Sequence, residues 1–266
     1  MSLDPLQALQ AANRAPPRPA DAARTLLIVG ATGPLGSEIV RRLSGTHRFA
    51  RTRVLAAEPM RDGLRGVESV QVPAGAPLRD WPPAAADVAV VAFDPPRLRN
   101  GRERALWAPD PSQLGELAAW LRRCGVRTLA VVQPHDQGRL PEALKHGLAD
   151  AGEHALAALD FECVLLLRSA RRPAGAPRLA ALHRLAAWML SVARFMVPAT
   201  ERPVRAARVA ELLDVALALA PPGVHVAAPE MVWAAAQGDA HAVAARWLLG
   251  RAGGDPVPAR DAWKAV

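Results

Sequence analysis

RTLLIVGATGPLG, residues Arg24–Gly36, is the stretch that decides the fold of this chain. An apolar, partly β-branched run ends at Gly30, and two more glycines, Gly33 and Gly36, follow at spacings of three. Beyond them the period changes, because the apolar residues within 39–43 recur three or four positions apart, as on the buried face of a helix. The stretch predicts a strand, a tight glycine-rich turn and a helix.

The glycines of this turn have the spacing that receives a dinucleotide pyrophosphate. Gly30 allows the backbone to leave the strand with dihedral angles that other residues avoid. Gly33 lets the main chain approach the phosphates, and Gly36 lets the helix pack closely on the strand. The helix N-terminus offers N–H groups and a partial positive charge to the anion. We predict a dinucleotide site here, the alternative being a βα turn without a ligand. The predicted cofactor-binding residues of the turn are Gly30, Thr32, Gly33, Pro34, Leu35 and Gly36.

The composition bounds the class of protein. The chain has 266 residues, of which 51% are hydrophobic, enough for a substantial core. This length fits one large α/β domain or one domain with a small lobe. No apolar run approaches the roughly 18 residues of a membrane span, and the N-terminus has no secretory pattern. We therefore expect a soluble, cytoplasmic protein with no transmembrane segment.

The net charge of +8 reflects a bias in composition. Of the 33 basic residues only Lys145 and Lys264 are lysines, which leaves 31 arginines, and these are scattered instead of clustered. The pattern argues against a nucleic-acid partner. Cys124 and Cys163 lie among apolar residues with no Cys or His neighbour at metal-ligand spacing. We expect buried reduced thiols there, and no metal site.

An acidic residue follows the second predicted strand, 52–57. Glu58 lies about 20 residues beyond Gly36, where a carboxylate in this kind of fold accepts hydrogen bonds from the adenosine ribose. Its charge would repel a 2′-phosphate, which favours NAD over NADP. Arg61 and Arg65 argue the other way, so NAD or NADP remains open with NAD slightly favoured. The alternative for Glu58 is a solvated carboxylate at a strand end.

The rest of the first half alternates strands with helices. Strands are predicted at 67–73, 87–93, 128–133 and 161–167, and helices at 111–123 and 142–159. This order predicts an α/β fold, a doubly wound parallel sheet of the Rossmann kind with right-handed crossovers. Ligands of such sheets lie beyond the carboxyl ends of the strands. Phe93, at the end of the fourth strand, is therefore added to the predicted cofactor-binding residues.

Four segments are predicted along the chain. They are a flexible Pro/Ala-rich leader at 1–24, the NAD(P)-binding core at 25–170, a small, mostly helical C-terminal lobe for a substrate or partner at 171–250, and a tail at 251–266. Within the lobe, helices are predicted at 178–196, 206–219, 229–236 and 240–249, and a short strand at 224–227. The apolar stripe of helix 178–196 fits core packing, or a face toward a membrane or partner.

The chain resembles the atypical and extended short-chain dehydrogenases/reductases over about residues 25–236. The likeness is carried by the glycine turn after Leu26–Val29, by Asp87–Val91 as a fourth strand, by Gly125-Val126-Arg127 before the fifth, and by Glu153 upstream of Cys163–Arg168. Arg205–Ala210 is similar to a late helix of the family. The spacing of this C-terminal part is most similar to the Tat-interacting oxidoreductase-like branch.

The resemblance implies a reductase whose Tyr moves a proton while a Lys four residues later holds the nicotinamide ribose. This chain has no tyrosine. If Lys145 is the family lysine, Pro141 stands at the tyrosine position. If Glu153 and Arg168 set the register, Lys145 falls on the tyrosine position and Ala149 on the lysine position. Neither register yields the pair.

The remaining catalytic expectations also depart from the family. The serine expected after the fifth strand is replaced by Gln133-Pro134-His135. The pKa of a free histidine suits proton transfer near neutral pH, so His135 is a weak catalytic candidate, the alternative being an ordinary loop histidine. Lys145 is a second weak candidate that could bind cofactor hydroxyls. The adenine-side Asp often found after the third strand is replaced by Pro73-Ala74-Gly75.

Three functions fit these observations. The first is an NAD(P)-dependent oxidoreductase acting on a small carbonyl or quinone-like substrate without the Tyr/Lys pair. The second is a catalytically silent NAD(P)-binding protein with a regulatory, redox-sensing or assembly role. The third is a module that binds a membrane surface or protein partner through helix 178–196. Whether the chain is an enzyme stays open, because fold alone does not decide function.

Overall fold

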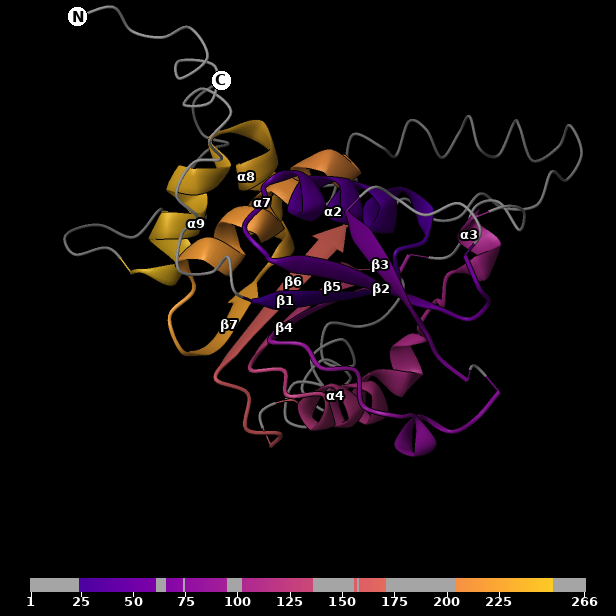
Figure 1. Cartoon of the computed structure of the whole chain (residues 1–266). Helices are drawn as coiled ribbons and strands as arrows, with labels where there is room; N and C mark the ends of the chain where they lie inside the picture. The colour runs from indigo at the N-terminus through magenta and orange to yellow at the C-terminus, as the bar shows by residue number, and fades with distance from the viewer. Residues whose placement is uncertain are drawn as a thin grey trace, which may run out of the picture.

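A computed structural model describes residues 24–60, 66–73, 75–94, 102–135, 156, 158–170 and 204–250. These residues form one sheet of seven parallel strands in the order β3-β2-β1-β4-β5-β6-β7 (Figure 1). In chain order the strands are β1 (Thr25–Val29), β2 (Arg51–Ala56), β3 (Val67–Gln71), β4 (Val88–Ala92), β5 (Thr128–His135), β6 (Cys163–Ala170) and β7 (Gly223–Ala227). The predicted fold class, a doubly wound parallel α/β sheet, is confirmed.

The central strands β1 and β4 are almost entirely apolar because both faces of the sheet are covered. All five residues of β4 are buried, as are four of the five in β1. The two strands pair in parallel with Leu26 opposite Val88 and Val29 opposite Val91. At the edge, β3 has no buried residue. The burial pattern therefore follows strand position in the sheet.

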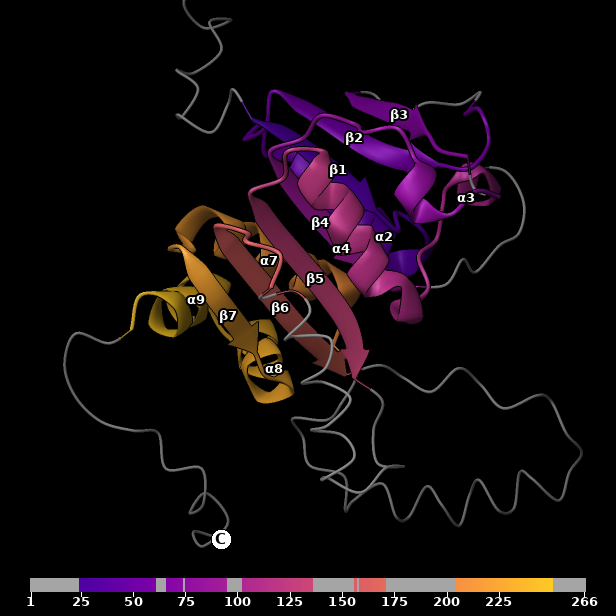
Figure 2. The same ribbon diagram turned by 90° about the horizontal axis from the view of Figure 1, so that it is seen from below.

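Helices cover both faces of the sheet (Figures 1 and 2). On one face lie α2 (Gly33–Gly45), α7 (Ala206–Leu219), α8 (Pro229–Gln237) and α9 (Ala240–Leu248). On the other lies α4 (Leu114–Arg123), with the short 3₁₀ helices η2 (Leu78–Asp80) and η3 (Pro111–Gln113) beside it. The short helix α3 (Arg102–Ala105) follows the segment after β4. No helix among these described elements is long and apolar enough to cross a membrane.

The helix predicted at 206–219 matches α7, and the other predicted elements that the structure describes are shifted by a few residues at most. The predicted helix 111–123 begins as η3 and continues as α4. The predicted helix 178–196, the leader and the tail lie outside the described residues, as does most of the predicted helix 142–159.

The described part of the segment predicted as a C-terminal lobe packs on this same sheet. β7 pairs in parallel with β6, with Cys163 opposite Gly223, and extends the sheet to its far edge. α7 packs against α2 and β6, while α8 and α9 pack against α7. Apolar residues of these helices share one hydrophobic cluster with β1 and α2. Residues 204–250 are therefore continuous with the sheet core.

Three tryptophans organise the core on the α4 face. The ring centroid of Trp81 lies 4.9 Å from that of Trp107 and 5.5 Å from that of Trp120, both in edge-on geometry. The indole N–H of Trp81 donates to the Ala76 carbonyl, and that of Trp120 donates to the Pro82 carbonyl. The rings therefore attach the loop before β4 and the segment after α3 to α4.

Both cysteines are free and buried. Burial raises the pKa of the Cys163 thiol to about 11. Burial likewise raises the pKa of Cys124, whose sulfur accepts a hydrogen bond from the Ala84 N–H. Both side chains therefore stay protonated near neutral pH and act as small apolar core residues.

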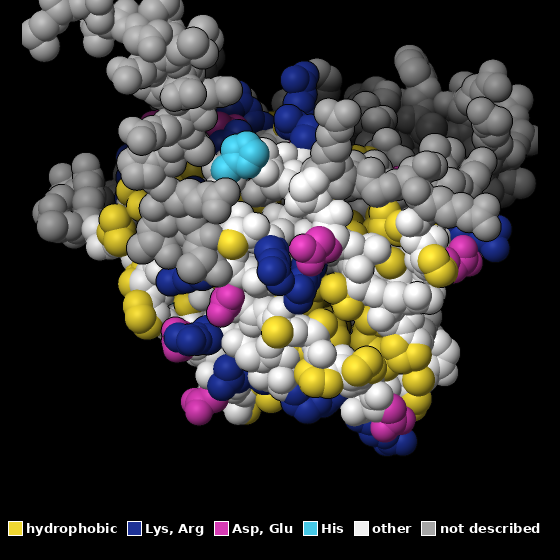
Figure 3. All heavy atoms as spheres, in the orientation of Figure 1, with side chains coloured by type: hydrophobic (Ala, Val, Ile, Leu, Met, Phe, Trp, Pro, Cys, Tyr) yellow, Lys and Arg dark blue, Asp and Glu magenta, His cyan; other side chains and the backbone are white. Residues whose placement is uncertain are grey.

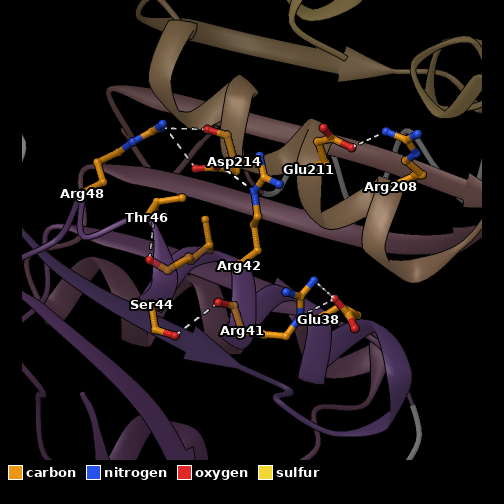
Figure 4. Close-up of polar contacts among 10 residues, drawn as sticks. Glu38, Arg41, Arg42, Ser44, Thr46, Arg48, Arg208, Glu211 and Asp214 are labelled. Carbon is orange, nitrogen blue, oxygen red and sulfur yellow. Dashed lines mark hydrogen bonds and ion pairs between the residues drawn. The ribbon is translucent and has the colours of Figure 1, made fainter. Parts of the chain in front are cut away.

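A buried carboxylate joins α2 to α7 (Figure 4). Asp214 on α7 is 3% exposed. Its carboxylate lies 3.0 Å from the Arg42 Nε and 3.3 Å from an Arg48 guanidinium nitrogen. Arg48 also donates to the backbone carbonyl of Asp214. Two guanidinium groups thus compensate one carboxylate that the core would otherwise leave without a counter-charge.

Asp214→Asn should lower the free energy of unfolding by about 3 kcal/mol, because it leaves two guanidinium groups without their buried counter-charge. Urea denaturation measures this difference. The matched control is Glu211→Gln on the same helix, where an exposed pair joins Arg208 and Glu211 at 2.7 Å. Its effect should stay below about 1 kcal/mol. Equal losses from the two variants would contradict a specific role for Asp214.

Candidate functional site

The turn between β1 and α2 is built on glycines that no other residue can replace without movement. Gly30 and Gly33 have φ angles of 77° and 65°, in the region that L side chains rarely adopt. A Cβ at Gly30 would lie 2.0 Å from the Ala92 carbonyl oxygen, and one at Gly36 would lie 2.3 Å from the Gly30 carbonyl oxygen. The turn therefore lies directly against the end of β4 and the start of α2.

This turn lies at the switch point of the sheet. β1 has β2 on one side and β4 on the other, and the chain reaches β4 only after it has formed β2 and β3. Ligands of open parallel sheets bind in the crevice beyond the carboxyl ends of the strands at such a point. The register of β1 against β4 brings Gly30 beside Ala92 at this edge. The half-buried Pro109 packs next to Gly30 as well.

Two hydrogen bonds join the turn to the segment after β4. The hydroxyl of Thr32, a fully buried residue, donates to the backbone carbonyl of Asp94 at 2.6 Å. The Leu35 N–H donates to an Asp94 carboxylate oxygen at 2.8 Å. Thr32 is the N-cap of α2, yet its side chain does not cap the helix. The carboxylate at the first turn of α2 therefore comes from Asp94, a residue 59 positions away from Leu35.

Asp94 is a residue at the turn that was not among the predicted cofactor-binding residues. Its position, directly after a buried strand that neighbours β1, was a usable signal. Because parallel strands end at the same edge of a sheet, the first polar side chain after β4 lies close to the glycine turn. That it would bond Leu35 depends on side-chain geometry, which spacing alone does not give.

Glu58 lies at the same edge, just beyond the end of β2. Its side chain is 51% exposed, and its carboxylate lies 3.4 Å from the Nε of Arg104. The Glu58 N–H donates to the Ala105 carbonyl, which holds the residue against the end of α3. The Arg104 guanidinium thus offsets part of the negative charge of Glu58.

The other predicted site residues are placed less favourably or not at all. Phe93 follows β4, but it is 4% exposed and its ring belongs to the core on the α4 face, so only its backbone borders the edge. His135 is the last residue of β5, opposite Ala170, and its side chain is not described. Lys145 lies outside the described residues, as do Arg61 and Arg65. Within the described ranges, no three His, Cys, Asp or Glu side chains gather as metal ligands.

The charged side chains of the described surface are mixed. On the face seen in Figure 3, arginine side chains lie beside Asp and Glu side chains. Among the described residues, Arg41 pairs with Glu38 at 2.6 Å. Such a distribution gives an anion little attraction over distance.

Comparisons with known proteins found similarity in structure only. No family model and no curated protein matches the chain. Similar solved structures include MoeE5 in complex with UDP-glucuronic acid and NAD, with 16% identity over 76% of this chain and 75% of that chain and a TM-score of 0.46. A mutated uronate dehydrogenase has 18% identity over 77% and 73% of the chains, with a TM-score of 0.44. WbmG of Bordetella bronchiseptica, in complex with NAD, has 14% identity over 79% and 74%, with a TM-score of 0.43. At these identities and scores, the ligands of those proteins do not establish what this chain binds.

Gly36→Ala should destabilise the fold by about 2 kcal/mol or more, since the added methyl group overlaps the Gly30 carbonyl and the α2–β1 contact must open. The control is Gly45→Ala at the exposed end of the same helix, where a Cβ would meet nothing within 4 Å. That change should be neutral or stabilising by up to about 1 kcal/mol. Thermal unfolding of both variants measures the difference, and comparable melting temperatures would argue against a tight α2–β1 contact.

Proposed function

We propose that this chain binds a nicotinamide dinucleotide at the β1–α2 turn and acts as an oxidoreductase of the atypical short-chain dehydrogenase type. The observation that carries the proposal is the cradle at the switch point. Gly30 and Gly33 have positive φ angles, and a side chain at Gly30 or Gly36 would overlap the neighbouring backbone. A turn of this shape before a helix N-terminus suits a pyrophosphate. Assignment to the Tat-interacting branch stays a prediction.

The backbone of the site fits this cofactor, and Glu58 supports NAD as the preferred form. The pyrophosphate would lie against Gly33 and the first turn of α2. The exposed carboxylate of Glu58, at the end of β2, would accept hydrogen bonds from the adenosine ribose. Arg104 beside it reduces the repulsion of a 2′-phosphate, so the preference for NAD over NADP is small.

The proposed reaction is hydride transfer to a small carbonyl or quinone-like acceptor. When bound, the nicotinamide supplies the hydride. Because the chain has no tyrosine, the proton that completes reduction of the acceptor oxygen comes from water, or from His135 at the end of β5. Lys145 is proposed to hold cofactor hydroxyls. The protein's contribution is then chiefly to hold the two reactants in position.

A second candidate is a catalytically silent NAD(P)-binding protein with a regulatory, redox-sensing or assembly role. It is favoured by the absence of tyrosine from the chain. Such a protein would use bound cofactor to alter a surface that a partner recognises. Turnover separates this candidate from the first.

The proposed function is tested by melting temperature with NAD⁺, NADH, NADP⁺ and NADPH. A ligand at 100 times its dissociation constant adds about 2.7 kcal/mol of stability, which a thermal scan detects. Gly33→Asp should abolish the shift, because it brings a carboxylate to the phosphate position. Gly66→Asp is the control, since Gly66 also has a positive φ, 76°, with open space around it. No shift in the intact chain, or an unchanged shift in Gly33→Asp, would refute the site.

Turnover is then followed as loss of NADH fluorescence on addition of small quinones and aldehydes. Oxidation by the intact chain, absent in Gly33→Asp, supports the oxidoreductase. Binding without oxidation of NADH by any acceptor supports the silent protein instead.

Glu58→Ala should weaken NAD binding about tenfold, the equivalent of a hydrogen bond to a charged group, while NADP binding changes little. The ratio of the two dissociation constants, measured by calorimetry, reports the change. Glu68→Ala is the matched control, because Glu68 is 55% exposed and pairs with Arg53 on the neighbouring strand. An unchanged ratio in Glu58→Ala would remove Glu58 from the site.

A further inference from the structure

We propose that Asp94 is an internal anion that competes with the cofactor pyrophosphate for the first turn of α2. The inference rests on the proposed function and specifies how its site is regulated. In the structure the Asp94 carboxylate accepts a hydrogen bond from the Leu35 N–H. A cofactor phosphate can therefore bond to this N–H only after the Asp94 carboxylate has moved away from it. By this competition Asp94 lowers the affinity of the site for the cofactor.

The contact itself is short and positioned by a second bond. An Asp94 carboxylate oxygen lies 2.8 Å from the Leu35 nitrogen. The Thr32 hydroxyl holds the backbone carbonyl of the same residue at 2.6 Å. Because Thr32 is fully buried and stands at the N-cap position of α2, its hydroxyl holds the backbone of Asp94 next to the turn. The carboxylate is therefore delivered to Leu35 by local structure.

The first turn of α2 has few free N–H donors, so the hydrogen bond from Leu35 to Asp94 removes a large share of them. Pro34 has no N–H to offer, and the Gly36 N–H bonds the Thr32 carbonyl inside the helix at 3.2 Å. The Leu35 N–H is given to Asp94. Among the first four residues of α2, these contacts leave the N–H of Gly33 for an incoming anion. Release of Leu35 would double the number of first-turn N–H groups for a phosphate.

The negative charge of Asp94 makes the competition stronger than the loss of one N–H donor alone would make it. The positive end of a helix favours one anion, and a half-buried carboxylate already occupies it. A pyrophosphate bound beside it would face a like charge, and this repulsion would oppose binding of the cofactor. Asp94 also takes part in at least one further interaction in the structure.

Asp94→Asn separates the charge from the hydrogen bond, since an amide oxygen still accepts from the Leu35 N–H. We expect this variant to bind NADH and ADP-ribose about tenfold more tightly than the intact chain, in titrations by calorimetry. Adenosine, which has no pyrophosphate, should bind both proteins equally. Asp94→Ala should change affinity in the same direction, and it provides the second variant if Asp94→Asn does not fold.

The matched control is Asp87→Asn. Asp87 is also half-buried, and its carboxylate also accepts a backbone N–H at 2.8 Å, from Thr25 at the opposite edge of the sheet. The Asp87→Asn substitution should leave the affinity for NADH unchanged. If Asp94→Asn binds NADH as the intact chain does, or more weakly, competition is refuted while the dinucleotide site stands. If neither protein binds any dinucleotide, the proposed function fails, and the role of Asp94 fails with it.

Discussion

Gly30 has no side chain, and this sets how closely the first turn of the chain approaches the neighbouring strand. Any Cβ there would lie 2.0 Å from the Ala92 carbonyl oxygen, so another residue would force β1 and β4 apart where the sheet opens. Gly36 extends the same constraint to α2, which rests on the Gly30 carbonyl. The closeness of these backbones brings Asp94 within hydrogen-bond distance of Leu35 and shapes the turn that we propose as a dinucleotide site.

Helix α2 is held at both ends by aspartates from distant parts of the chain. Asp94, after β4, bonds the first turn, and Asp214 on α7 pairs with Arg42 in the last turn. Asp94 is stabilised by the partial positive charge at the N-terminus of α2. The buried carboxylate of Asp214 is stabilised by the counter-charge of Arg42. The two contacts differ in consequence. The Asp214 contact joins α7 to α2, whereas the Asp94 carboxylate lies where we propose that a cofactor phosphate binds.

The sequence predicted most of the fold and only the backbone of the site. The apolar runs of β1 and β4 predicted buried strands, because a strand covered on both faces is apolar throughout. The spacing of the apolar residues in α4 predicted a helix with one buried face. The turn could be predicted from the spacing of its three glycines, because a close backbone approach requires glycine at fixed positions. The bond between Asp94 and Leu35 could not be predicted, because it spans 59 positions and depends on a side-chain rotamer. Phe93 shows the same limit: its place after β4 was predicted, but the burial of its ring in the α4-side core was not. The pairing of β7 with β6 likewise depends on long-range packing.

The most direct test is an amide NMR titration of the ¹⁵N-labelled chain with NADH. If the pyrophosphate binds at the β1–α2 turn, the resonances of Gly33 and Leu35 move together and saturate with one dissociation constant. The Leu35 resonance moves because its hydrogen-bond partner changes from Asp94 to a phosphate. Gly223 and Gly238, in β7 and after α8, should stay in place. Saturable binding that shifts other residues and leaves Gly30–Gly36 unmoved would contradict this account, as would the absence of any shift.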